Sequence, residues 1–193
     1  MSHPKKPETT HNIHPLILER WSARSFSQKP ISTETMEALF EAASWSASSM
    51  NEQPWEYLFA EKGSSAFEQM IDCLMDGNQP WAKNGSHMLI SLAKRKFNDK
   101  DRDNRHHMHD VGAANSALLM QAAHIDIYGH MMGGFHMDKA LSAFGIDSEK
   151  FEIACFIVLG HLDVPEKLDE PFHKRELQPR TRKPVSEFTK KLD

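Results

Sequence analysis

Cysteine, long apolar runs and excess positive charge are all scarce in this chain of 193 residues. Its two cysteines, Cys73 and Cys155, stand alone in apolar stretches, which favours buried reduced thiols over a disulfide and indicates a cytoplasmic protein. No apolar run approaches the roughly 18 residues of a membrane span, and the first 14 residues lack the apolar stretch of a signal peptide. The formal net charge of -4 gives no overall basic surface for nucleic acid.

The common motifs of nucleotide binding and hydrolysis are also absent. The chain has no G-x-G-x-x-G, no P-loop and no G-x-S-x-G. The segment RHHMHD, residues 105–110, invites a metal site, but His106, His107 and His109 lack the i, i+4 spacing of two ligands on a helix. We therefore expect no metal and no catalytic triad, and a histidine-based metal-binding domain remains only an alternative.

Helical and strand patterns alternate along the chain, with helices in the majority. Apolar residues recur at helical spacing after Ser32 or Thr33, either of which can cap the helix, and Asp110 is expected to cap the longest helix. Helices are expected over residues 14–22, 32–45, 64–75, 110–129 and 137–146. Strands are expected over residues 55–61, within 86–96 and over 151–162, with turns at 77–81 and 130–135. This order predicts a layered α/β or α+β domain.

The ends of the chain carry little core material. Residues 1–12 are expected to be a flexible N-terminal segment, and residues 13–193 a single domain. From residue 163 onward the chain is a long tail with four prolines. We expect this tail to pack against another surface, such as that of a partner subunit. The charged connector at residues 97–109 is a candidate lid.

Basic residues cluster near both ends of the domain. In ERWSARSF, Arg20 and Arg24 flank Ser22, and two guanidiniums this close repel unless an anion lies between them. They belong either to a phosphate site or to solvated surface. In the tail, Arg180 and Arg182 stand in an extended, proline-bounded segment, which is either solvated or meets the first cluster on one phosphate.

Two further segments have compositions that would suit contact with a planar ligand. SASSMNEQPW, residues 46–55, crowds hydroxyl and amide side chains that can read the edge of a planar heterocycle or simply satisfy a turn. MMGGF, residues 131–135, has two glycines where the backbone can approach something flat, or where the chain merely turns. Neither segment decides between its two interpretations alone.

The order of these stretches resembles the nitroreductase family of FMN-dependent oxidoreductases. An R-x-S-x-R segment is followed by S-S-x-N-x-Q-P-W, an Ala- and Gly-rich helix, M-G-G-F, an apolar strand ending in LGHL, and R-x-R-K-P. The resemblance covers about residues 13–190. It implies an α+β fold, with a mixed central sheet surrounded by helices, in an interlocked homodimer with two FMN sites at its interface.

The resemblance also implies a role for each candidate residue. The anion between the arginines becomes the FMN phosphate, and its ligands become Arg20, Ser22, Arg180 and Arg182. Arg24 becomes the cation near the flavin pyrimidine, where positive charge favours the reduced flavin, and the Gly133 N–H faces flavin N5. The other cofactor-binding residues implied are Ser48, Ser49 and Asn51, which reach the flavin of the second subunit, and Met131, Met132 and Gly134, which line one flavin face.

Three positions depart from the family pattern. Ala47 replaces a proline of many members, which should loosen the loop, and Gly133 replaces an acidic residue of some members. A second lysine near the flavin pyrimidine has no matched position, although Lys83 and Lys94 are available.

The implied activity is hydride transfer from NADPH or NADH through flavin N5 to a nitroaromatic, quinone or similar acceptor, in a ping-pong cycle. Because the chemistry belongs to the cofactor, no catalytic side chain is expected. The alternatives are a specialised flavin reaction, such as reductive removal of a ring substituent, and a non-catalytic flavin-binding redox sensor. No nucleic acid or membrane partner is expected.

Overall fold

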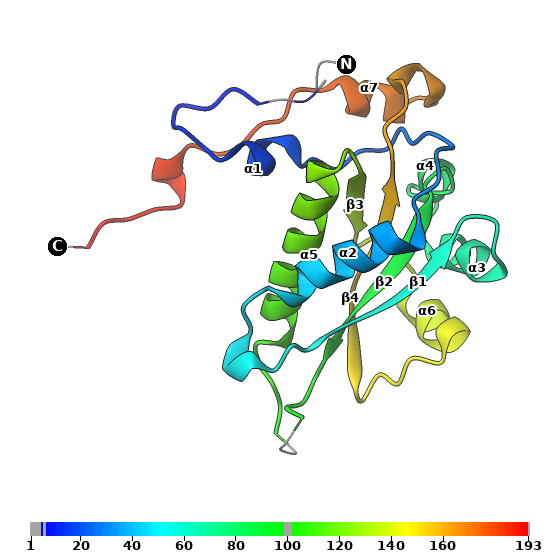
Figure 1. The fold of residues 1–193 in the computed structure, drawn as a ribbon, viewed down its shortest axis with the longest axis vertical. Coiled ribbons are helices and arrows are strands. Elements are labelled where there is room, and N and C mark those ends of the chain that lie inside the picture. The colour runs from blue at the N-terminus through cyan, green and yellow to red at the C-terminus, as the bar shows by residue number, and fades with distance from the viewer. Residues whose placement is uncertain (1–4, 6, 99–101, 193) are drawn as a thin grey trace.

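The computed structural model describes residues 5, 7–98 and 102–192, and a sheet with helices on both faces lies at its centre (Figure 1). The strands follow the order β1-β2-β4-β3. Their bounds are Trp55–Glu61 for β1, His87–Lys94 for β2, Tyr128–Met132 for β3 and Phe151–Gly160 for β4. The expected α+β class is confirmed. All pairings among the described strands are antiparallel, so the expected mixed sheet is corrected for this part of the chain.

Helices cover both faces of the sheet, and short helical turns lie in the connections and in the tail. The α-helices are α1 (Pro15–Glu19), α2 (Thr33–Ser44), α3 (Ser65–Cys73), α4 (Gln79–Ala82), α5 (His107–His124), α6 (Met137–Phe144) and α7 (Phe172–Leu177). The 3₁₀ turns are η1 (Ser49–Asn51), η2 (Pro165–Lys167) and η3 (Val185–Glu187). The central strands β2 and β4 are buried along most of their length, as their continuous apolar sequences predict.

Two apolar clusters hold the layers together. One joins α2 and α5 to one sheet face through residues such as Leu39, Leu118 and Ile157, and the other joins α3, α4 and α6 to the opposite face. As predicted, Ser32 caps α2, and its Oγ accepts a hydrogen bond from the Thr35 N–H at 3.2 Å. Small side chains let α5 lie close to the sheet. At Gly129 an added Cβ would be 2.2 Å from Leu119 Cδ2.

Several predicted boundaries were wrong. Asp110 does not cap α5, because the helix begins at His107 and Asp110 lies in its first turn. The helix also ends at His124 rather than just before Gly129. Part of the predicted turn at 130–135 is strand, because residues 128–132 pair with β4, with Tyr128 opposite Gly160. Long-range pairing of this kind overrides local pattern.

Two further segments also differ from expectation. The predicted turn at 77–81 overlaps α4, and the predicted tail contains α7. In the N-terminal segment the side chain of Lys5 is buried, and its ammonium donates to the Arg175 carbonyl at 2.8 Å. Residues 1–4 and 6 of that segment lie outside the described residues, as do residues 99–101 of the expected lid. The described ends of that connector are held together by a bridge between Lys96 and Asp103.

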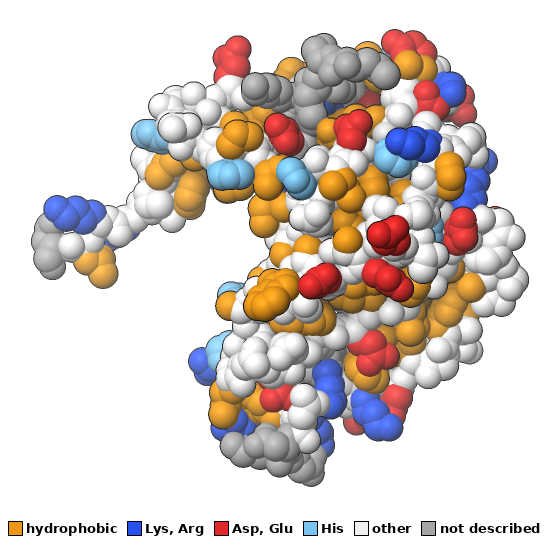
Figure 2. Space-filling view, viewed as in Figure 1, with side chains coloured by type: hydrophobic (Ala, Val, Ile, Leu, Met, Phe, Trp, Pro, Cys, Tyr) orange, Lys and Arg blue, Asp and Glu red, His pale blue; other side chains and the backbone are white. Residues whose placement is uncertain are grey.

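The last part of the chain extends away from the body. Figure 1 shows α1 and the segment after α7 running side by side past the upper end of α5, with the C-terminus beyond them. We call α1 and the segment after α7 the arm. Figure 2 shows a concave side between the arm and the helices and sheet below it, with apolar side chains on both. Large apolar side chains of the tail are exposed, with Phe188 67% and Leu192 80% accessible. Among the described helices none is long and apolar enough to cross a membrane.

Candidate functional site

The segment from Arg20 to Ser25 is extended, and its side chains alternate between two environments. The buried ones are Trp21, Ala23 and Ser25. Arg20 and Arg24 are partly buried and Ser22 is exposed. Because successive side chains of an extended chain point to opposite sides, the odd-numbered residues anchor this segment and the even-numbered ones present their polar groups together. The R-x-S-x-R spacing therefore places all three predicted ligands on one side of the chain.

The tail brings two more arginines to this segment. Burial, and then the charge of Arg182, lower the pKa of Arg20. Burial, and then the charges of Arg20 and Arg182, lower the pKa of Arg180. Within the described ranges, no carboxylate forms an ion pair with any of these three guanidiniums. The fold thus gathers three positive charges from opposite ends of the sequence, none of them in an ion pair with a carboxylate of the described residues, which is the arrangement of an anion-binding site.

Arg180 also has a structural task. Its Nη1 donates to the carbonyl oxygen of Leu18, and to that of Lys5 at 3.4 Å. It therefore fixes the end of α1 to the tail. Among the residues that the structure describes, Arg182 donates to the carbonyl of its neighbour Thr181 alone, at 2.7 Å. The two tail arginines are thus unequal candidates for a phosphate, and Arg182 has more of its donors available.

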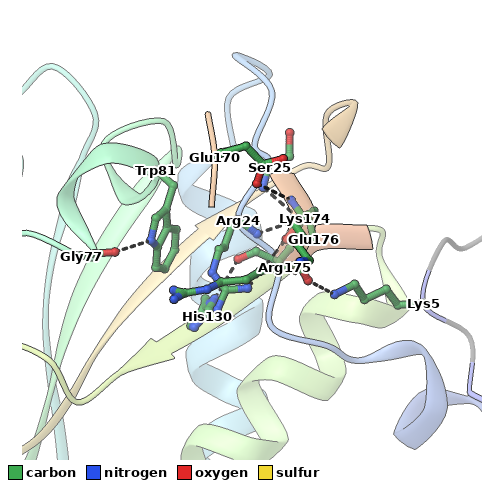
Figure 3. A network of polar contacts seen from close by, with 11 residues as sticks. Lys5, Arg24, Ser25, Gly77, Trp81, His130, Glu170, Lys174, Arg175 and Glu176 are labelled. Atoms are coloured by element: carbon green, nitrogen blue, oxygen red, sulfur yellow. Dashed lines mark hydrogen bonds and ion pairs between the residues drawn. The ribbon is translucent and has the colours of Figure 1, made fainter. Parts of the chain in front are cut away.

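Arg24 is held by α7 (Figure 3). Glu176, whose side chain is 2% exposed, accepts hydrogen bonds at Oε1 from the N–H groups of Arg24 at 2.9 Å and Ser25 at 3.1 Å. Its Oε2 lies 3.9 Å from Arg24 Nη1, a long ion pair. The Arg24 guanidinium carbon also lies 5.5 Å from the centroid of the Trp81 ring. Burial lowers the pKa of Arg24, and the Glu176 charge opposes this shift.

His130 of β3 completes this group of side chains. Its ring packs on Trp81 with centroids 4.5 Å apart, and its Nδ1 lies 3.0 Å from the Ala23 carbonyl oxygen. Burial, then the charge of Arg24, lower the pKa of His130 to about 4. The imidazole is therefore neutral near pH 7 and adds no further positive charge to the site.

The two glycines after β3 differ in what surrounds them. A Cβ added to Gly133 would meet nothing within 4 Å, whereas one added to Gly134 would be 2.9 Å from Asn78 Nδ2. The Gly134 carbonyl accepts hydrogen bonds from the Met75 N–H and from Asn78 Nδ2, both at 3.0 Å. Packing thus explains Gly134, while Gly133 faces open space in this chain. Of the two preceding methionines, Met131 is 40% exposed and Met132 is buried.

The loop with Ser48, Ser49 and Asn51 is not brought to the arginines within one chain. The Ser49 N–H donates to Asp110 Oδ2 at 2.9 Å, so the loop is fixed to the first turn of α5. Figure 1 shows α1 beside the other end of α5, and an 18-residue helix is about 27 Å long. Two of the loop residues, Met50 and Asn51, have positive φ angles of 56° and 57°. These left-handed conformations fold the loop into a compact projection.

Sequence reasoning missed three residues of the site. Glu176 lies in a helix that the proline-rich tail concealed, and no motif marked it. Trp81 and His130 come together only through the placement of α4 beside β3. Neither Lys83 nor Lys94 contacts the arginines by any described hydrogen bond or ion pair, and Trp81 stands beside Arg24 instead.

The histidine segment at 105–110 serves local structure. His107 Nδ1 lies 2.7 Å from the Asn104 carbonyl oxygen and its Nε2 lies 3.0 Å from Glu152 Oε2. In the part of the chain that the structure describes, no group of three metal-ligating side chains occurs. A shallow pocket elsewhere on the surface includes none of the predicted site residues, and is lined by Ser27, Gln28, Lys29, Pro30, Glu61, Lys62, Gly85 and Ser86.

Comparisons with known proteins identify the family and the overall fold of the chain. The sequence model of the Nitroreductase family matches residues 17–79. The chain is 32% identical over 97 residues to the major NAD(P)H-flavin oxidoreductase of Aliivibrio fischeri, and the match spans 47% of this chain and 44% of that protein. A solved oxidoreductase containing FMN is 30% identical, with a TM-score of 0.90 over 98% of this chain and 96% of its own. The chain belongs to the nitroreductase family.

More distant structures share the fold. A nitroreductase family protein from Streptococcus pneumoniae has a TM-score of 0.75 at 15% identity, over 92% of this chain and 98% of its own. This likeness supports the architecture, with its antiparallel sheet and flanking helices, across almost the whole described chain.

Proposed function

We propose that this chain is an FMN-dependent oxidoreductase that uses NADPH or NADH to reduce a small acceptor such as a nitroaromatic or a quinone. The observation that carries the proposal is the meeting of Arg20, Arg180 and Arg182 with no carboxylate partner among the described residues. The FMN in the 30% identical oxidoreductase and the name of the Aliivibrio fischeri relative support the same cofactor and electron donor.

The residues present fit FMN. Arg20, Arg182 and the exposed Ser22 offer donors for its phosphate, with Arg180 behind them fixing the two chain segments. When bound, FMN would supply the two-electron redox chemistry that links NAD(P)H to the acceptor, in the proposed ping-pong order. No side chain needs to act as a nucleophile or as a general base.

Arg24 is the residue proposed to contact the flavin pyrimidine. Its guanidinium makes no hydrogen bond with any described residue and has only the long ion pair with Glu176. A half-buried guanidinium with unused donors is prepared to donate to carbonyl or anionic oxygens. Gly133 is proposed to bring its N–H to N5, since nothing in this chain occupies the space that a side chain would fill there.

A homodimer with shared sites is part of the proposal. The loop of Ser48, Ser49 and Asn51 lies near one end of α5 and the arginine cluster near the other, so the loop is proposed to serve the partner's flavin. The exposed Phe188 and Leu192 of the tail would be buried on that partner. Each subunit would then give one loop and one tail to the assembly.

Visible spectroscopy of the purified chain, after incubation with FMN and gel filtration, tests the proposal. We expect retained flavin bands that bleach within seconds when NADPH or NADH is added without oxygen. Bands that do not bleach would instead favour the redox sensor or a specialised flavin reaction. A colourless protein that binds no FMN by calorimetry would contradict the proposal and leave the arginines as surface charge.

A further inference from the structure

Glu176 is a buried carboxylate that the proposed function does not yet use. Its side chain is 2% exposed, and it lies where α7 meets the segment from Arg20 to Ser25. Burying a carboxylate is unfavourable unless hydrogen bonds and positive charges compensate for lost water. The compensation for Glu176 comes from a few groups, and most of them belong to Arg24 or its neighbour.

The two oxygens of Glu176 have different partners. Oε1 accepts hydrogen bonds from the backbone N–H groups of Arg24 and Ser25, at 2.9 and 3.1 Å. Oε2 is buried without a hydrogen bond in the described structure and lies 3.9 Å from Arg24 Nη1. One oxygen therefore fixes the backbone that carries Arg24, while the charge of the other faces its guanidinium without binding it tightly.

Other positive groups surround the same carboxylate. Lys5 and Arg175 both interact electrostatically with this pair, and Lys5 also donates to the Arg175 carbonyl at 2.8 Å. Figure 3 shows Arg24, Lys5 and Arg175 around Glu176. Glu176 is the negative charge at the centre of this cationic group, so its removal would leave the positive charge of Arg24 less compensated.

We propose that Glu176 is a positioning residue that fixes Arg24 through its backbone and moderates the positive charge that Arg24 presents to the flavin. This inference rests on the proposed function, because it gives Arg24 a flavin to face. A positive charge near the flavin pyrimidine favours the reduced cofactor, and a buried carboxylate behind that charge weakens the effect. Glu176 would therefore keep the flavin easier to oxidise than Arg24 alone would make it.

Glu176→Gln separates charge from geometry. The glutamine oxygen can still accept both backbone hydrogen bonds, but the negative charge is gone. We expect the variant to bind reduced FMN, relative to oxidised FMN, about tenfold more tightly than the unchanged protein does. For a two-electron couple this is a rise of about 30 mV in the midpoint potential. Glu166→Gln, which removes the same charge from an exposed site in η2, should leave the potential unchanged.

A double-mutant cycle with Arg24→Gln tests whether the effect passes through Arg24. With Arg24 already neutral, Glu176→Gln should change the potential by less than half as much as it does in the unchanged protein. An equal change in both backgrounds would overturn the positioning role. So would a Glu176→Gln potential equal to that of Glu166→Gln, and in both cases FMN binding by the unchanged protein would leave the proposed function standing.

Hydrogen exchange without FMN provides a readout that does not depend on the cofactor. Glu176→Asp retains the charge but is one methylene too short to hold both N–H groups. We expect the Arg24 and Ser25 amides to exchange at least tenfold faster in this variant, and unchanged protection would refute the anchoring. This experiment remains informative if Glu176→Gln does not fold. If the unchanged protein binds no FMN, the proposed function fails while the exchange result still decides whether Glu176 anchors Arg24.

Discussion

The imidazole of His130 lies against the indole of Trp81, with ring centroids 4.5 Å apart and the ring planes inclined by 37°. A carbonyl oxygen can only accept a hydrogen bond, so the contact with the Ala23 carbonyl assigns the ring proton of His130 to Nδ1. The other ring nitrogen then has no proton at neutral pH. A second proton would place a positive charge beside Arg24 in a partly buried site.

The pH dependence of stability should report this partly buried histidine. The folded-state pKa of His130, about 4, lies below the roughly 6.5 of an unfolded histidine. The unfolded state therefore binds more protons between these values, and the free energy of unfolding should fall as the pH falls from 6.5 to 4. The contribution of His130 is at most about 3 kcal/mol. Urea unfolding at pH 7 and at pH 4.5 measures it.

Two variants isolate the His130 contribution from other groups that titrate. His130→Gln retains a donor for the Ala23 carbonyl but cannot titrate, so its stability should change less between the two pH values. His11→Gln, at an exposed histidine, should behave as the unchanged protein does. If His130→Gln and the unchanged protein lose equal stability, His130 titrates normally and the burial argument is wrong.

Removing the uncompensated arginines should have opposite effects with and without FMN. In Arg20→Ala/Arg182→Ala, two positive charges that repel each other disappear, so the free energy of unfolding without FMN should stay unchanged or rise by up to about 1 kcal/mol. The added stability from FMN should be lost. That increment is about 2.7 kcal/mol when free FMN is at a hundred times its Kd. Thermal unfolding with and without FMN measures both effects.

Lys190→Ala/Lys191→Ala provides the matched control for this variant. It removes the same charge from exposed positions in the tail and should retain the whole FMN increment. An arginine variant that keeps the full increment would remove Arg20 and Arg182 from the phosphate site.

Local patterns indicated the candidate site residues better than they indicated the residues that support them. Arg20, Ser22 and Arg24 could be identified from the R-x-S-x-R motif alone. Alternate side chains of an extended segment lie on the same side of the chain, and this does not depend on long-range packing. The approach of Arg182 to Arg20 was predicted from motif order. Glu176 could not be predicted, since its role depends on where α7 packs.

The same distinction holds for the fold. The apolar pattern of β4 and the Ser32 cap of α2 are local, and both were predicted. β3 was missed because its five residues, Tyr128–Met132, become a strand by pairing with β4. Short strands depend on such long-range pairing, which one sequence does not reveal.

Gly133 and Gly129 should respond in opposite ways to the same substitution. An alanine Cβ at Gly133 meets nothing within 4 Å, so Gly133→Ala should stabilise the protein without FMN by about 0.4–1 kcal/mol. It should weaken FMN binding at least tenfold if the flavin lies against this backbone. An alanine at Gly129 would bring Cβ to 2.2 Å from Leu119 Cδ2, and should destabilise the protein by about 1–3 kcal/mol.

Calorimetry with FMN and urea unfolding of both variants check this pair of predictions. Normal FMN affinity in Gly133→Ala would place the flavin elsewhere. Unchanged stability in Gly129→Ala would show that α5 and β3 are packed less tightly than the structure has them.

Mixing two defective variants should restore flavin sites if each site is shared between subunits. One variant is Arg20→Ala/Arg182→Ala, and the other replaces Ser48, Ser49 and Asn51 by alanine. A mixed dimer then has one site with every lesion and one site with none. Random exchange makes about half of the dimers mixed, so about a quarter of all sites should recover FMN.

The alternative arrangement gives a different result in the same experiment. If the loop served the flavin of its own chain, each site of a mixed dimer would still have one lesion, and no sites would recover. Each variant incubated alone under the exchange conditions is the control, and FMN retained after gel filtration is the measurement. Recovery requires that a loop fixed to α5 through Asp110 reaches a cluster on another copy of the chain. Its absence in dimers that demonstrably exchange subunits would show that each chain builds its own site.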